Sequence, residues 1–172
     1  MTTRSGPALP LVMSALGTFL TAAWFRPDRY PAGHLLISEE GYHVTADLPS
    51  VLLYRRLFKT SRNGLANVMM LHEADDLGGS ADAHTALSKA VRALFAATST
   101  FVVHALPEAK VHDLIAAGVP LSRTAVQTIP TLGRGIAWWQ RGRRGGPRQT
   151  LLSDLEARLT DTDSAMTAGR AA

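Results

Sequence analysis

Polar and acidic side chains follow two short apolar runs of this sequence, and they are the residues best placed to do chemistry. Glu39 and Glu40 follow the apolar run 35–37 after one serine, Ser38, and His72 follows the run 65–71. In α/β proteins, ligands bind beyond the carboxyl ends of the strands, so two strand ends of this kind predict a shared crevice. A strand, a helix and a second strand in this order are what a nucleotide-binding sheet requires. Ordinary solvated loops after the two runs are the alternative interpretation.

Other kinds of chemistry find less support in the residues. The lysines follow Phe, Ser and Ala, so the chain holds no Gly-Lys pair and no phosphate-cradling Gly-x-x-x-x-Gly-Lys-[Ser/Thr] loop. The segment 72–76 resembles a helical zinc-protease motif, but it ends in Asp76 and leaves a strand. Glu108 and His112 are one helical turn apart, which favours a surface pair over metal ligands. Spacing alone supports no Ser, His, Asp triad.

A cluster of arginines beside two tryptophans suggests a second kind of site. Trp138 and Trp139 precede a segment that has the charge for phosphates, and aromatic rings of this kind stack on bases. A solvated hairpin tip, with the tryptophans partly in the core, is the simpler alternative. On a strand the two tryptophans point to opposite faces, so at most one of them is expected to stack on a base. The arginines of the cluster are Arg141, Arg143, Arg144 and Arg148.

The composition is that of a single globular domain. Of the 172 residues, 46% are hydrophobic and 19% are charged, which suffices for one core and excludes general disorder. No cysteine is present, so disulfides and thiolate metal sites are excluded. The formal net charge of +4 is moderate, and its local clustering matters more than its total. We expect one domain over 9–165, with mobile ends at 1–8 and 166–172.

The apolar pattern predicts alternating helices and strands. The segment 11–25 shows helical spacing and is expected to be a buried amphipathic helix, with a secretory signal as the alternative; it is too short to span a membrane. Asp47 is predicted to cap a helix that runs to Asn63-Gly64. We also expect strands at 65–71 and 101–103, helices at 81–96, at 107–117, after Ser122 and after Ser153, and a hairpin that pairs 136–140 with 149–152 through the loop 141–148.

In this order the segments resemble the C-terminal half of the RecA-like ATPase domain of conjugative-transfer and type IV secretion ATPases, of the actinobacterial type. The resemblance covers about residues 8–165. The run 35–42 is similar to the Walker B strand of that family, and 59–68 is similar to the segment before its next strand. The segments 132–138 and 161–166 resemble the family's closing motifs. The implied fold class is α/β, a partial RecA-like P-loop NTPase sheet with flanking helices and a C-terminal β-hairpin.

The resemblance implies roles for individual residues. Glu40 matches the catalytic glutamate that orients the attacking water, Glu39 replaces the aspartate of the magnesium site, and Tyr42 replaces an aromatic residue. An alternative register puts Ser38 at the aspartate position. His72 matches the polar end of the next strand and is the third catalytic candidate. The residues implied to contact the nucleotide are Ser38, Arg62, Asp76 and Arg134.

The departures from the family matter as much as the matches. The family's Walker A loop belongs upstream of the matching segments, and the acidic pair is altered. Without P-loop amides and a lysine, little holds the β- and γ-phosphates, and such positioning is most of phosphoryl-transfer catalysis. We therefore expect a truncated or degenerate ATP-binding-type domain that does not hydrolyse ATP alone. The alternative is a non-catalytic nucleic-acid-binding or assembly module that uses the segment 141–148.

Cofactors, partners and location follow from the resemblance. ATP and magnesium are the implied cofactors, if any is bound. The implied partners are a polypeptide that carries Walker A or further copies of this chain, together with the secretion or conjugation machinery. The arginine cluster adds an expectation of weak DNA binding, and no transmembrane segment is expected. The implied location is the cytoplasm, with peripheral attachment at the inner face of the membrane left open.

Overall fold

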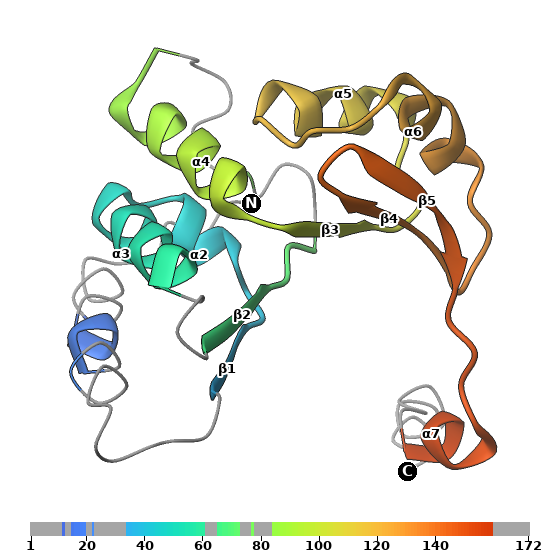
Figure 1. Ribbon diagram of the computed structural model, residues 1–172, viewed down its shortest axis with the longest axis horizontal. Coiled ribbons are helices and arrows are strands. Elements are labelled where there is room, and N and C mark those ends of the chain that lie inside the picture. The colour runs from blue at the N-terminus through green and yellow to red at the C-terminus, as the bar shows by residue number, and fades with distance from the viewer. Residues whose placement is uncertain are drawn as a thin grey trace, which may run out of the picture.

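The computed structural model describes residues 12, 15–19, 22, 34–60, 65–72, 77 and 84–159. These residues form a mixed α/β fold with two small sheets (Figure 1). Within the described ranges, no helix is long and apolar enough to cross a membrane. The elements, in chain order, are β1 (His34–Ser38), α2 (Tyr42–Thr45), α3 (Leu48–Thr60), β2 (Leu65–Met69), α4 (Ala86–Ala97), β3 (Thr100–Val103), α5 (Glu108–Ala116), α6 (Arg123–Thr128), the 3-10 helix η3 (Ile129–Thr131), β4 (Ile136–Arg141), β5 (Arg144–Gln149) and α7 (Asp154–Leu159).

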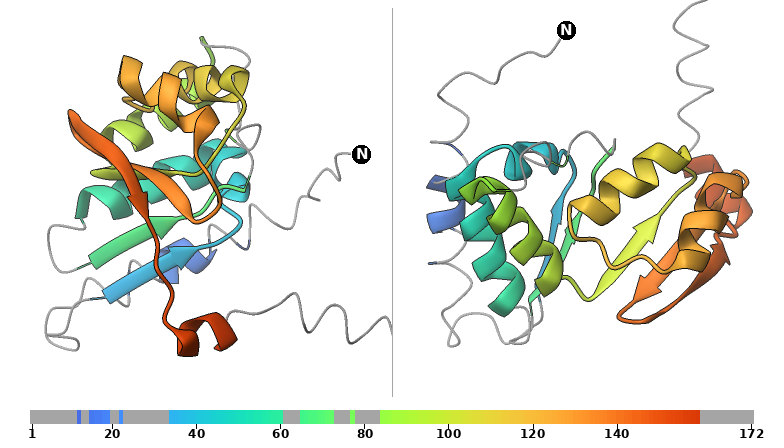
Figure 2. Two further views of the ribbon diagram at one scale, coloured as in Figure 1. Left: turned by 90° about the vertical axis from the view of Figure 1, so that its right-hand side faces the viewer. Right: turned by 90° about the horizontal axis from the view of Figure 1, so that it is seen from above.

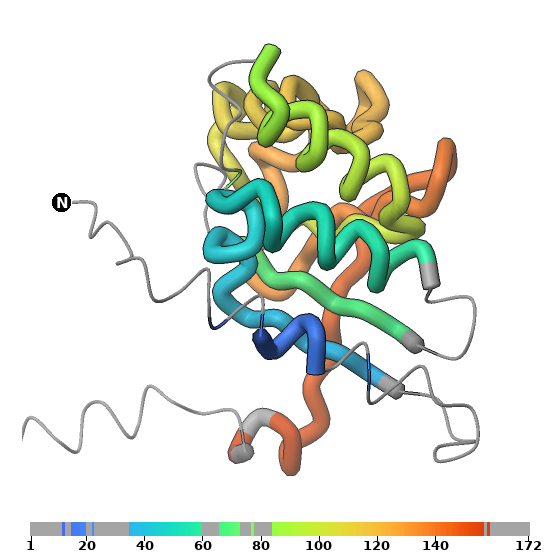
Figure 3. The backbone as a smooth tube through the Cα atoms, turned by 90° about the vertical axis from the view of Figure 1, so that its left-hand side faces the viewer, coloured from blue at the N-terminus to red at the C-terminus, as the bar shows by residue number. Residues whose placement is uncertain are grey.

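The first sheet consists of β1 and β2, which pair in parallel from His34 opposite Leu65 to Ser38 opposite Met69. Both strands form where the sequence predicts them, although β2 ends two residues earlier, at Met69. Helices α2 and α3 connect them, α3 contacts β2, and α4 runs beside α3 (Figure 3). Leu36 packs against the core beneath these helices.

No described helix covers the opposite face of this sheet, so β1 departs from the burial on both faces that a continuous apolar run such as 35–37 typically indicates. Figure 2 (left) looks onto this face, with the described helices α2 and α3 behind it. Successive residues of a strand point to opposite faces, so covering one face leaves every second apolar side chain in solvent. The exposed apolar face comprises Leu35, Ile37, Val68 and Met70, each at least 45% exposed.

The described part of the segment 11–25 is helical, but its large apolar side chains are not buried. Gly17 is buried against α3, where a β-carbon on Gly17 would collide with the side chain of Leu53. Val12, Leu16 and Phe19 are exposed, between 45% and 66%. The amphipathic pattern therefore predicted the helix but not its burial. Gly17 packs against α3, whereas Val12, Leu16 and Phe19 point into solvent.

Several helices begin at a residue whose side chain caps the helix, as the sequence predicts. Asp47 Oδ2 accepts hydrogen bonds from the backbone N–H of Ser50 at 3.0 Å and from its hydroxyl at 2.8 Å, which confirms Asp47 as the cap of α3. The hydroxyl of Ser122 accepts from the N–H of Ala125 at 3.1 Å and caps α6, also as predicted. Helix α4 starts at Ala86, later than predicted, because Thr85 caps it by accepting from the N–H of Ser88.

The second sheet is antiparallel, with β4 between β3 and β5. Helices α5 and α6 cover one of its faces (Figure 1). Trp138 of β4 is 3% exposed on that side and belongs to one hydrophobic cluster that also includes Val51 of α3 and Leu94 of α4. A single core therefore supports both sheets, although the described strands of the two sheets are not hydrogen-bonded to each other.

A C-terminal hairpin forms, but its second strand is 144–149 instead of the predicted 149–152, so its turn is far shorter than the predicted loop 141–148. Arg141 pairs directly with Arg144, so only Gly142 and Arg143 connect the strands. Gly142 has a φ of 56°, as the first central residue of a tight hairpin turn requires. Pro147 lies in β5, an edge strand among those described, where the missing N–H costs little. The glycines and arginines are thus mostly strand residues and do not form a long flexible loop.

The last described helix, α7, begins with a reciprocal cap predicted from Ser153. The N–H and hydroxyl of Ser153 donate to Glu156 Oε2 at 2.8 and 2.7 Å, and the N–H of Glu156 donates back to the hydroxyl at 3.3 Å. The hydrogen bonds from the Ser153 side chain and backbone lower the pKa of the Glu156 carboxyl.

We predict that α7 loses helicity as the pH falls through the lowered pKa of Glu156. A depressed carboxyl pKa means that the cap is fully formed above the ordinary glutamate range and is lost on acidification. NMR titration of the Glu156 side chain should show a midpoint below that of an unpaired glutamate. Replacing Ser153 with alanine should raise the midpoint toward the ordinary value, because the hydroxyl donor is lost while the backbone N–H remains; an unchanged midpoint in that variant would contradict the cap.

Candidate functional site

Two glutamates form a short loop that is fastened at both ends to the end of β2. The N–H of Met70 donates to the carbonyl of Ser38 at 2.8 Å, and the carbonyl of Met70 accepts from the N–H of Gly41 at 2.9 Å. Glu39 and Glu40 lie between these two attachments and are exposed. The two hydrogen bonds to one residue therefore fix where both carboxylates leave the sheet.

Gly41 permits this close approach of the two strand ends. A β-carbon at this position would lie 2.8 Å from the carbonyl oxygen of Met70 and 2.6 Å from Cγ of Met69. The φ of Gly41 is −61°, which any residue adopts, so the requirement for glycine is one of space. Sequence reasoning did not single out this residue, although a glycine directly after two acids was the available signal.

The structure brings together Glu40 and His72, which the sequence placed at separate strand ends. Glu40 Oε1 lies 3.8 Å from His72 Nε2, and the two side chains are 56% and 51% exposed. The pair attracts only when His72 is protonated, and at this exposure it adds little to stability. Its importance is positional, since a carboxylate and an imidazole face the same open edge of a parallel sheet.

Ser38 points away from this edge, toward helix α3. Its hydroxyl donates to the phenolic oxygen of Tyr54 at 2.9 Å. Glu39, the other candidate for the magnesium position, is exposed and lies beside Glu40 in sequence. Magnesium in nucleotide sites is usually held by one or two carboxylates together with substrate phosphates, so Glu39 fits one ligand of such a site. Among the described residues, no group of three or more acidic, histidine or cysteine side chains could hold a metal ion.

The remaining nucleotide-binding candidates do not join this cluster in the described structure. Arg62 and Asp76 lie outside the described residues. Arg134 lies at the second sheet, in the turn between η3 and β4. Of the predicted catalytic and nucleotide-binding residues, the described structure therefore places Glu39, Glu40 and His72 at this edge of the first sheet.

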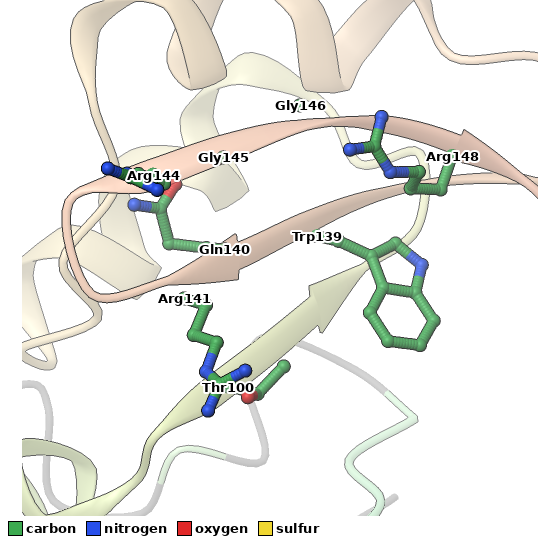
Figure 4. A pocket seen from close by; sticks show the side chains of 8 residues that line it. All are labelled: Thr100, Trp139, Gln140, Arg141, Arg144, Gly145, Gly146 and Arg148. Atoms are coloured by element: carbon green, nitrogen blue, oxygen red, sulfur yellow. The ribbon is translucent and has the colours of Figure 1, made fainter.

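The arginine cluster occupies one face of the second sheet and the turn of its hairpin. A hollow of about 380 Å³ is lined by Arg141, Arg144 and Arg148 together with Trp139 (Figure 4). Arg143 is exposed in the turn itself. The prediction that the two tryptophans face opposite ways is confirmed, because Trp138 is 3% exposed and Trp139 is 45% exposed.

Comparison with known proteins supports the fold. No protein-family model and no curated protein matches the chain. Among solved structures, the chain is similar to VirB4 of Thermoanaerobacter pseudethanolicus, with a TM-score of 0.61 and 13% sequence identity. The match covers 88% of this chain and 40% of that one, so this chain spans less than half the length of the solved protein. At this identity the likeness concerns the fold, and the predicted α/β class with flanking helices is confirmed.

Proposed function

We propose that this chain is a domain of the type IV secretion ATPase kind that supplies the acidic half of a nucleotide site. The observation that carries the proposal is the meeting of Glu40 and His72 at the carboxyl ends of two adjacent parallel strands. The motifs at these strand ends are those that resemble the secretion ATPases, and VirB4 shares the fold over 88% of the chain. Fold and motifs therefore point to one family.

Each residue at the strand ends has a role in this proposal. Glu39 would contribute a carboxylate to a magnesium ion bound with the nucleotide, which neutralises charge on the phosphates. Glu40 would orient the attacking water, since its carboxylate is exposed and its loop is fixed by the hydrogen bonds of Met70. His72 would hold the carboxylate of Glu40 in position from 3.8 Å.

The phosphate-binding half of the site comes from outside these 172 residues in this proposal. The chain has no Gly-Lys pair, and exposed carboxylates repel phosphates unless cations offset their charge. A P-loop brings backbone N–H groups and a lysine to the β- and γ-phosphates. The proposed domain therefore turns over ATP only when such a loop is placed next to Glu39 and Glu40.

We predict that the purified chain alone releases no phosphate from Mg-ATP above the buffer background. Adding the polypeptide segment that carries the Gly-Lys-[Ser/Thr] loop, sought first in the reading frame next to this one, should restore turnover. Glu40→Gln should abolish that turnover, because an amide does not take the place of the carboxylate that orients water. The assay is steady-state phosphate release.

A matched control is available on α5. Glu108 Oε1 lies 3.9 Å from Nε2 of His112, and both side chains are exposed, as in the Glu40 and His72 pair. Glu108→Gln should leave turnover unchanged, which separates the loss of a charge from the loss of the site. Turnover by the chain alone that depends on Glu40 would overturn the need for a second segment, and equal effects of the two substitutions would overturn the site.

A further inference from the structure

Strand register places three arginines and one tryptophan on the same face of the second sheet. Residues opposite each other on antiparallel strands share a face. Arg141 lies opposite Arg144, Trp139 lies opposite Gly146, and Ala137 lies opposite Arg148. Thr100 and Val102 of β3 continue this face, because they pair with Arg141 and Trp139. We call this surface, formed by Thr100, Val102, Trp139, Arg141, Arg144, Gly146 and Arg148, the basic face.

The other side of the hairpin holds Trp139 in its outward position. Trp138 is buried, and its Nε1 donates to Gln140 Oε1 at 2.9 Å. Gln140 Nε2 donates in turn to the carbonyl of Gly142 at 2.7 Å, which ties the turn to the core. A β-carbon on Gly145 would collide with Gln140 and Trp138, so glycine is needed there. The strand is therefore fixed in a register that presents Trp139 to solvent.

The basic face has the charge of an anion site and no acidic residue within its strands. None of β3, β4 and β5 contains Asp or Glu. Within the described ranges, no carboxylate pairs with Arg141, Arg144 or Arg148. Arg144 and Arg148 are about 13 Å apart along β5, from the rise of about 3.3 Å per residue. The three guanidinium groups are therefore spread too widely along the sheet for a single phosphate group to contact all of them.

The surroundings of Trp139 suit a flat ring. Trp139 is 45% exposed, and a β-carbon on the opposite residue, Gly146, would have no atom within 4 Å. Figure 4 shows the indole standing out from the hairpin in the hollow that Arg148 also lines. A base stacked on this indole would lie beside the row of arginines, with its phosphates within their reach.

We infer that the basic face binds single-stranded nucleic acid, with one base stacked on Trp139 and the backbone along Arg141, Arg144 and Arg148. The exposed ring favours a single strand over a duplex, whose bases are stacked on each other and present no free face. The exposed ring also favours nucleic acid over an anionic lipid surface, because lipid headgroups have no bases to stack on it. This site is separate from the strand ends of β1 and β2 and does not depend on the function proposed above.

Fluorescence anisotropy with a short fluorescein-labelled oligothymidylate tests this inference. We expect binding at low salt, with log affinity falling against log salt at a slope of about −2, from three contacts at about 0.7 each. The triple variant Arg141→Gln, Arg144→Gln, Arg148→Gln should lose at least about tenfold in affinity and most of the slope. Trp139→Ala should lose about tenfold, while Trp139→Phe, which keeps a stacking ring, should retain most of the affinity.

A charge-matched control uses three exposed cations on helices, Lys89, Arg123 and Arg158. Their triple Gln variant removes the same charge and should bind like the unchanged chain. Circular dichroism should show the same fold for every variant, because all substituted side chains are exposed. Equal losses in the two triple variants, tighter binding to a duplex of the same length, or binding to anionic phosphatidylglycerol vesicles but not to oligothymidylate would each overturn the inference.

Discussion

Gly41→Val is expected to lower the free energy of unfolding by about 3 kcal/mol and to pull the loop of Glu39 and Glu40 away from β2. A β-carbon there would meet the Met70 carbonyl oxygen at 2.8 Å, and backbone cannot move aside as the end of a side chain can. Valine adds two methyl groups to that collision. Because the φ of −61° suits any residue, the loss would come from space alone. Urea unfolding, followed by far-UV circular dichroism, measures it.

Gly133→Ala is a control that adds a β-carbon to a glycine with room around it. Its β-carbon would lie 3.9 Å from Ile136 Cδ1, an ordinary contact. Stability should therefore change by less than about 0.5 kcal/mol. If Gly41→Val unfolded at the same urea concentration as the unchanged chain, the close approach at Met70 would not govern the geometry of the strand ends.

The chain is expected to self-associate at micromolar concentration through the uncovered face of the first sheet. Leu35, Ile37, Val68 and Met70 lie together on that face, and monomeric proteins rarely leave such a patch in water. No described strand pairs with the outer edge of β1 or with the edge of β2 that faces away from β1. Unpaired strand edges recruit further strands, which strengthens the tendency.

Sedimentation velocity over a range of concentrations measures this association. The double variant Leu35→Lys, Ile37→Lys should shift the distribution toward the monomer, because two charges on the patch repel a second copy. Ile115→Lys changes an exposed apolar residue of α5 outside the patch and should leave the distribution unchanged. A well-folded monomer at all concentrations in the unchanged chain would contradict the prediction.

Local patterns in the sequence determined most of the elements. Asp47, Ser122 and Ser153 each begin a helix as predicted, because a cap depends on residues only three positions apart. The apolar runs predicted β1, β2 and β3, and the alternation on β4 predicted opposite faces for Trp138 and Trp139. Acidic and polar residues after β1 and β2 predicted that the two strand ends share one edge, where the structure places Glu40 and His72 3.8 Å apart.

Only the tertiary structure decided which faces are covered and how the arginines are held. The burial of β1 and of Leu16 depends on where helices distant in the sequence pack. An apolar run in the sequence does not contain that information. The sequence predicts a loop at 141–148 because glycine and proline are poor strand formers. In the structure, position 145 requires glycine because the side chains of Trp138 and Gln140 occupy the space that a β-carbon would need. Likewise, Gly41 is required by the carbonyl of Met70, a residue brought beside it only by the pairing of β1 with β2.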